Sequence, residues 1–222
     1  MFGALVVFGA GCSGNDGGDG ADDAGPVDSD AGPVEVGELT PSLRPTVKFK
    51  GNARLQNDFA RALELDIDQV CVELGRFSCA ELVHRVPLGG SSAFDLGLYQ
   101  PLATTTLTSP IAVERVAMSA CVARAERDFA ALAGDSGEAA LIFSGIELDA
   151  AGALRDVSSA PVAAAIDTLY KRALQRRASA SEIAHLRALY DDIAAAESDR
   201  PARDWAALSC FAVMTTMEQL FY

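Results

Sequence analysis

Apolar side chains recur at helical spacing through most of the chain beyond residue 40. Leu55, Phe59, Ala62 and Leu63 follow this spacing, which predicts a helix that ends near Asp66. A stripe of this kind is stable only where another element covers it. We therefore expect several helices packed around a shared core.

The middle of the chain combines a long predicted helix with irregular connections. Ser109 followed by Pro110 is typical of a helix start, with the serine as cap and the proline at the first helical position. That helix should run to Ala133, before Gly134. A short helix is expected over 79–86, closed by the proline that follows it.

Two segments in this region carry no helical pattern. Residues 87–92 (PLGGSS) indicate a loop. Residues 141–143 (LIF) are too short to distinguish a strand from a buried helical turn.

Start signals in the C-terminal third predict three further helices. Pro161 opens the first, and Ser179 with Glu182 forms a capping box at the start of the second. Pro201 starts the last, which should reach the C-terminus. Its expected inner face consists of Trp205, Leu208, Phe211, Ala212, Thr215 and Leu220. The whole pattern predicts an all-α fold, an irregular bundle of five to six helices over residues 41–222.

Charge divides the chain into a tether and a domain. Residues 13–40 hold eight acidic side chains, no basic one and no aromatic, whereas 41–222 hold 23 acidic and 18 basic residues, a net charge of −5. A Gly/Asp-rich segment cannot bury enough surface to offset its ordering entropy, so we expect 13–40 to be a disordered tether. The total charge of −13 argues against nucleic acid as a partner.

A short apolar run, Phe2 to Gly11, precedes Cys12. It has about half of the ~20 residues that a spanning helix needs, which is the length of a signal-peptide core. With Gly9-Ala10-Gly11 before the cysteine, the arrangement resembles the lipobox of bacterial lipoproteins. The resemblance implies that 1–12 is a signal peptide ending at a lipidated Cys12, that the lipid anchors the protein to a membrane of the cell envelope, and that Ser13 favours the outer membrane. An ordinary cleaved signal peptide is the alternative.

The same residues also match G-x-G-x-x-G over 9–14, after the strand-like segment 5–8. A dinucleotide site of this type needs a helix directly afterwards and an acidic residue after a second strand. Residues 15–30 (NDGGDGADDAGPVDSD) cannot form that helix. We therefore expect no dinucleotide and no other cofactor.

With Cys12 assigned to lipidation, four cysteines remain. In an oxidising compartment an even number favours disulfides, and four cysteines allow three pairings. We favour Cys71 with Cys79, which are close in sequence, and Cys121 with Cys210, which lie on the apolar faces of two long helices. Four buried thiols or another pairing stay open. No C-x-x-C occurs, so neither a redox dithiol nor a c-type haem site is expected.

One constellation resembles an enzyme motif. Residues 134–137 (GDSG) are similar to the sequence around the nucleophile of trypsin-like serine proteases, and His84, Asp95 and Ser136 follow that family's order. The resemblance covers four residues, and turns after helices have the same composition, so we expect a turn and no catalytic site. His84 and His185 are the only histidines and neither has a ligand cluster, so no metal site is expected. The acidic tether does not match EF-hand spacing.

The C-terminal third carries LYKRALQRR over 169–177, Ser179-x-x-Glu182 and TTMEQLFY over 215–222. This pattern is similar to the C-terminal helices of uncharacterised exported proteins of the planctomycete cytochrome-associated type. The resemblance spans about 60 of the 222 residues and implies an exported helical domain. Larger relatives often carry a c-type haem motif, which this chain lacks, so electron transfer is not implied.

Taken together, the sequence predicts an exported, lipid-anchored protein of the bacterial cell envelope with a structural or interaction role and a protein partner there. No enzymatic activity is expected. Two alternatives stay open: an accessory or binding subunit of an exported redox or hydrolytic system, and an enzyme whose site the sequence does not reveal.

Overall fold

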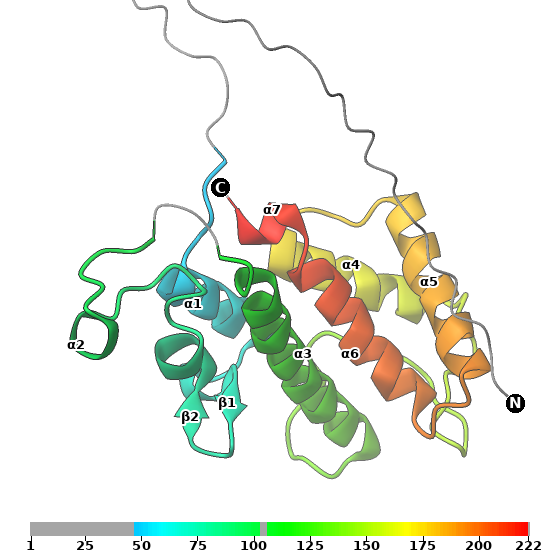
Figure 1. Ribbon diagram of the computed structural model, residues 1–222. Coiled ribbons are helices and arrows are strands. Elements are labelled where there is room, and N and C mark those ends of the chain that lie inside the picture. Colours follow the sequence, from blue (N-terminus) through cyan, green and yellow to red (C-terminus); the bar gives the residue numbers. More distant parts are fainter. Residues whose placement is uncertain (1–46, 103–105, 222) are drawn as a thin grey trace, which may run out of the picture. The chain divides into compact units, whose positions relative to one another are not determined.

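Helices dominate the computed structural model, which describes residues 47–102 and 106–221 (Figure 1). Five helices have 12 or more residues: α1 (Asn52–Leu63), α3 (Ser109–Ala133), α4 (Ala160–Leu174), α5 (Ala180–Ala195) and α6 (Pro201–Met214). The all-α prediction is confirmed. The predicted signal peptide, Cys12 and the tether lie outside the described residues.

Short elements connect these helices. They are α2 (Ala93–Leu96), α7 (Met217–Leu220), a 3₁₀ turn (Ile67–Gln69), a π turn (Cys79–Val83) and the antiparallel strands β1 (Val72–Glu73) and β2 (Phe77–Ser78). The prediction of a helix over 79–86 was wrong in length and type. The π turn ends at Val83, and the backbone amide of His84 closes it on the Cys79 carbonyl oxygen.

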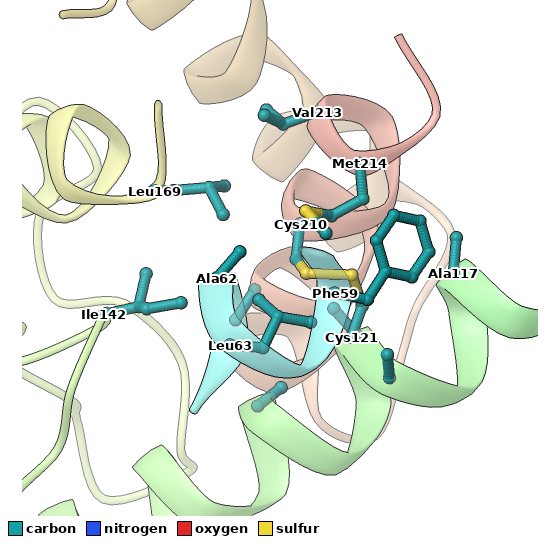
Figure 2. Packing of buried hydrophobic residues seen from close by; sticks show 14 of the residues in the cluster. Phe59, Ala62, Leu63, Ala117, Cys121, Ile142, Leu169, Cys210, Val213 and Met214 are labelled. Carbon is teal, nitrogen blue, oxygen red and sulfur yellow. A yellow bond between two sulfur atoms is a disulfide. The ribbon is translucent and has the colours of Figure 1, made fainter. Parts of the chain in front are cut away.

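The centre of the core lies between α3 and α6, which run side by side (Figure 1). Cys121 of α3 and Cys210 of α6 are fully buried and form a disulfide, with their Cα atoms 5.5 Å apart. Figure 2 shows Phe59 and Leu63 of α1 beside this sulfur bridge. The disulfide therefore joins α3 to α6 at the point where α1 packs against them.

A second disulfide, between Cys71 and Cys79, closes the β hairpin. The Cα atoms lie 5.4 Å apart, and the Cys79 backbone amide donates a hydrogen bond to the Cys71 carbonyl oxygen. The structure thus brings together both cysteine pairs that the sequence favoured.

The start of α3 differs from the prediction by one residue. Thr108 occupies the cap position without a capping side-chain bond, and Ser109 is the first helical residue. The Ser109 hydroxyl instead donates to the Pro87 carbonyl oxygen at 2.6 Å and accepts from the Thr106 backbone amide at 2.9 Å. This serine fastens the preceding loop to the helix rather than capping it.

Residues 141–143 form an irregular turn, neither a strand nor a helix. The carboxylate of Asp128, fully buried on α3, accepts hydrogen bonds from the backbone amides of Leu141, Ile142 and Phe143 at 2.7, 2.9 and 3.0 Å. Arg124, one helical turn earlier, pairs with it at 2.7 Å. A side chain supplies the hydrogen bonds that a regular element would have supplied.

The C-terminal helices follow the prediction at their start and depart from it at their end. The Ser179–Glu182 capping box is present at α5. The last helix begins at Pro201 as predicted, but its predicted end was wrong, because α6 stops at Met214 and Thr216 caps the separate α7 by accepting from the Gln219 amide. Ala212, expected inside, is exposed, and the buried positions are Val213 and Met214.

We expect Asp128→Asn to lower the free energy of unfolding by about 3 kcal/mol or more, because it leaves Arg124 as a buried charge without its partner. Urea denaturation followed by circular dichroism measures the loss. The matched control is Glu147→Gln, which removes the exposed pair with Arg155 and should cost less than about 1 kcal/mol. Equal losses in the two variants would contradict the structural role of Asp128.

The two disulfides should differ in their contribution to stability. The Cys121–Cys210 bridge spans 89 residues of chain and the Cys71–Cys79 bridge spans 8. Loop-closure entropy then predicts losses of about 4.5 kcal/mol for Cys121→Ala/Cys210→Ala and about 2.5 kcal/mol for Cys71→Ala/Cys79→Ala. Denaturation midpoints of the two double variants under oxidising conditions test this order, and a reversed order would refute it.

Candidate functional site

The three residues that resemble a serine-protease triad are not assembled. His84 Nε2 lies 2.8 Å from Glu73 Oε1, and Asp95 of α2 accepts from the Ser92 hydroxyl at 3.4 Å. The Ser136 hydroxyl is buried and has no hydrogen-bond partner among the described residues. Gly134 adopts a left-handed conformation (φ 77°) that ends α3, so the predicted turn is confirmed.

The polar cluster around His84 fastens the hairpin to α3. Glu73 of β1 accepts from His84 and, at 3.0 Å, from Arg115 of α3. The hydrogen bond from His84, followed by that from Arg115, lowers the pKa of the Glu73 carboxyl. The neighbouring cysteines are bonded to each other, so the cluster has no thiol beside it to act as a nucleophile.

The described residues contain no group of three or more His, Cys, Asp or Glu side chains arranged to hold a metal ion. His185 is exposed on α5, as expected for a surface histidine. Within residues 47–102 and 106–221, no helix combines the length and the apolar character that crossing a bilayer requires.

The strongest candidate for a binding site is an apolar groove of about 290 Å³. Its apolar lining comes from the start of α3, from α7 and from the two ends of the described chain: Phe49, Pro110, Val113, Met217, Leu220 and Phe221. Thr106, Ser109, Glu114 and Thr215 add polar groups. An open apolar groove with a few polar groups is typical of a binding site.

Residues from the two ends of the described chain form one wall of the apolar groove. Phe49 and Phe221 pair as an isolated antiparallel bridge, and their rings meet edge to face with centroids 5.6 Å apart. The Lys50 amide donates to the Leu220 carbonyl oxygen at 3.1 Å. These bonds fix the C-terminal segment against residues 49–50.

Arg176 connects α7 to the start of α5 through two ion pairs. Its guanidinium binds both carboxylate oxygens of Glu218 at 2.9 and 3.0 Å and both oxygens of Glu182 at 2.7 and 3.0 Å. The guanidinium also lies 5.1 Å from the ring centroid of Tyr170. The hydrogen bond from Arg176 lowers the pKa of Glu182 to about 2, and desolvation raises the pKa of Tyr170.

A second apolar feature consists of residues 86–102 and 106–108, which we term the apolar loop. Five of its large side chains are exposed: Phe94, Leu96, Tyr99, Leu102 and Leu107. Thr106 belongs to both the loop and the groove lining. Exposed apolar side chains gathered in one segment are typical of interaction sites.

No known protein-family profile matches the chain, and no curated protein or solved structure is similar to it. The function therefore has to be argued from the groove, the loop and the sequence.

Sequence reasoning missed both apolar features. The groove depends on the meeting of Phe49 and Phe221, which no local pattern indicates. The loop did leave a signal, because Asp95 is the only charged residue between Arg85 and Glu114. A stretch of that length with a single charged residue, most of it outside the long helix, indicates apolar side chains that do not belong to the core.

The pKa of Glu182 predicts acid sensitivity. A carboxyl whose pKa falls from 4.5 in the unfolded chain to about 2 in the fold stabilises the protein above the higher value, and this contribution is lost as the pH falls toward 2. We expect Glu182→Gln to remove this part of the pH dependence. Denaturation curves recorded from about pH 6 to pH 2 measure it.

The matched control is Glu126→Gln, which removes an exposed carboxylate that pairs with Arg203 at 3.2 Å. Its stability should fall with acid as in the wild type. The free energy of unfolding is plotted against pH for the wild type and for Glu182→Gln. If the two plots run parallel below about pH 5, where unfolded carboxyls begin to titrate, the ion cluster does not stabilise the fold in the way expected.

Proposed function

We propose that this protein is an exported, lipid-anchored helical protein of the bacterial cell envelope, sorted to the outer membrane by Ser13, and that its domain has an interaction role. The apolar run before Cys12 and the acidic tether after it support the anchor. The observation that carries the interaction role is the open apolar groove at the start of α3.

The residues that line the groove suit the binding of an apolar surface rather than acid–base catalysis. Among the described residues, the carboxyls with lowered pKa values are Glu73, Asp156, Asp167 and Glu182, and none of them lines it. Catalytic sites gather such perturbed groups, whereas binding grooves need apolar area with a few polar groups. Glu114 is the one charged residue of the lining.

The second candidate is an accessory subunit of an exported redox or hydrolytic system. The same apolar groove would then take the partner enzyme, and the similarity of the C-terminal third to cytochrome-associated exported proteins supports this candidate. The identity of the partner distinguishes the two.

The anchor is tested on protein purified from membranes of its native host. We expect mass spectrometry to find Cys12 as the N-terminal residue carrying a lipid, and Cys12→Ser to release the protein into the soluble fraction. A wild-type protein whose mature N-terminus lies elsewhere, or whose Cys12 thiol is unmodified, would overturn the lipoprotein proposal.

The same membranes test the interaction role. A photoreactive residue placed at Glu114 on the groove should cross-link to one defined envelope protein, which mass spectrometry identifies. The control position is Leu74, an exposed side chain in the turn of the hairpin. Identical products from the two positions would show that the groove is not the contact surface.

A further inference from the structure

We propose that the tip of the apolar loop is a second membrane contact, which places Phe94, Leu96 and Tyr99 in the interfacial region of a lipid bilayer. The inference rests on the proposed function for its setting, because the lipid at Cys12 brings the domain to a membrane. It goes beyond that function, because it assigns lipid as the ligand of a surface of the domain itself.

The tip is held in shape by its own backbone. Ser92 and Leu98 exchange two hydrogen bonds, of 3.0 and 2.9 Å, which close a small ring of chain around α2. Gly97 ends α2 in a left-handed conformation (φ 66°) that disfavours other residues. The tip therefore presents a defined shape before it meets any ligand.

The base of the loop is fastened to the body of the domain. The Ser109 hydroxyl binds the Pro87 carbonyl oxygen, and Leu88 is fully buried. The Gly90 amide donates to the Arg85 carbonyl oxygen at 2.8 Å, and a Cβ at Gly90 would come within 2.6 Å of the Arg85 side chain. With a fixed base and a closed tip, the segment around α2 extends from the edge of the domain near α1 (Figure 1).

Three large apolar or aromatic side chains at the tip are exposed. Phe94 is 102 % exposed, Tyr99 81 % and Leu96 65 %. Exposed Phe and Leu side chains gain free energy by leaving water, and Tyr suits the boundary between lipid and water because one end of its ring is polar. The chemistry of the tip matches the interfacial region of a bilayer.

Charge on the loop also fits a membrane. Asp95 is the one charged residue between Arg85 and Glu114, and it accepts the hydroxyl of Ser92 within the tip. The tip carries this one carboxylate and no basic residue, and the remainder of the chain is acidic, so anionic lipid would repel the protein while zwitterionic lipid would not. The proposed ligand is therefore a zwitterionic phospholipid surface.

The length of the chain outside the described residues allows this contact. About 34 residues separate Cys12 from Val47, where the described chain begins, and the tether expected from the sequence would have a mean end-to-end distance of roughly 30 Å. An anchored domain is thus confined close to the bilayer at a high effective concentration. Val47 is itself exposed, and Phe49 lines the same groove as Thr106 at the base of the loop.

A protruding tip suits lipid better than a protein partner. Phe94 and Leu96 lie on the ring closed by Ser92 and Leu98, Tyr99 directly follows it, and a protein partner would need a matching surface to cover these side chains. A fluid bilayer surface accommodates such a shape without one. Self-association through the tip would equally require a complementary surface on the second copy.

The test uses the chain from Ser13 to Tyr222, which is the proposed mature polypeptide without its lipidated Cys12. Phe94→Trp places an indole at the tip, and Leu74→Trp places one at the hairpin turn, which Figure 1 shows apart from α2. Both positions are highly exposed, and the native Trp205 is fully buried, so it adds a constant background. Phosphatidylcholine vesicles are added, and the emission wavelength is followed.

We expect a blue shift on vesicle addition for Phe94→Trp and none for Leu74→Trp. The paired variant Phe94→Ser/Tyr99→Ser should lower co-sedimentation with these vesicles about tenfold or more, whereas Leu74→Ser leaves it unchanged. Circular dichroism confirms that the variants are folded. Anionic vesicles at low salt should bind more weakly than zwitterionic ones.

Three outcomes would overturn the proposal: no blue shift at position 94, an equal shift at position 74, or a shift at position 94 that grows with protein concentration in the absence of vesicles. The last would identify a second copy of the chain as the occupant. None of these results bears on the lipid at Cys12, because the tested chain lacks residues 1–12. Failure of the tip and failure of the anchor are therefore distinguishable.

Discussion

The buried carboxylate of Asp128 organises one whole side of the domain. It accepts three backbone amides from residues 141–143 and pairs with Arg124, whose guanidinium also donates to the Leu63 carbonyl oxygen at the end of α1. The turn thus fixed delivers Phe143 to Trp205, with ring centroids 5.7 Å apart. The Trp205 indole in turn donates to the Leu186 carbonyl oxygen of α5. Removing the charge of Asp128 would remove the contacts that fix the turn over 141–143 and the Arg124 guanidinium at the end of α1, whereas the Cys121–Cys210 disulfide would still join α3 to α6.

The opposite side of the domain is organised differently, because its elements come from the two ends of the described chain. Phe49 and Phe221 meet there, and Arg176 links α7 to the start of α5 through two carboxylates. These contacts are half-exposed and partly ionic, so they depend on pH and salt more than the core does. The apolar groove therefore lies in the part of the fold whose geometry solution conditions can change most readily.

The sequence predicts elements well where the determining residues are neighbours. The capping box at Ser179 and the end of α3 at Gly134 are local, and both are as expected. The turn over 141–143 could not be assigned, because the side chain that fixes it lies on α3, more than a dozen residues earlier. The apolar groove could not be predicted for the same reason, because it forms only where Phe49 and Phe221 meet, and these residues are far apart in the sequence. Ser109 is an intermediate case. The sequence places the start of α3 within one residue, but the serine hydroxyl binds the Pro87 carbonyl oxygen instead of capping the helix.

The spacing of the cysteines has a consequence for the order of events during synthesis. In a chain that emerges N-terminus first, Cys71, Cys79 and Cys121 are present before Cys210 exists, so an early oxidant meets three thiols and could join the wrong two. The hairpin favours the local pair, because Val72 and Ser78 are paired and Cys71 and Cys79 are separated by only 8 residues. Closing the local bridge first would leave Cys121 as the remaining partner for Cys210. The small two-stranded sheet, a minor element of the finished fold, therefore bears on which cysteines can meet early.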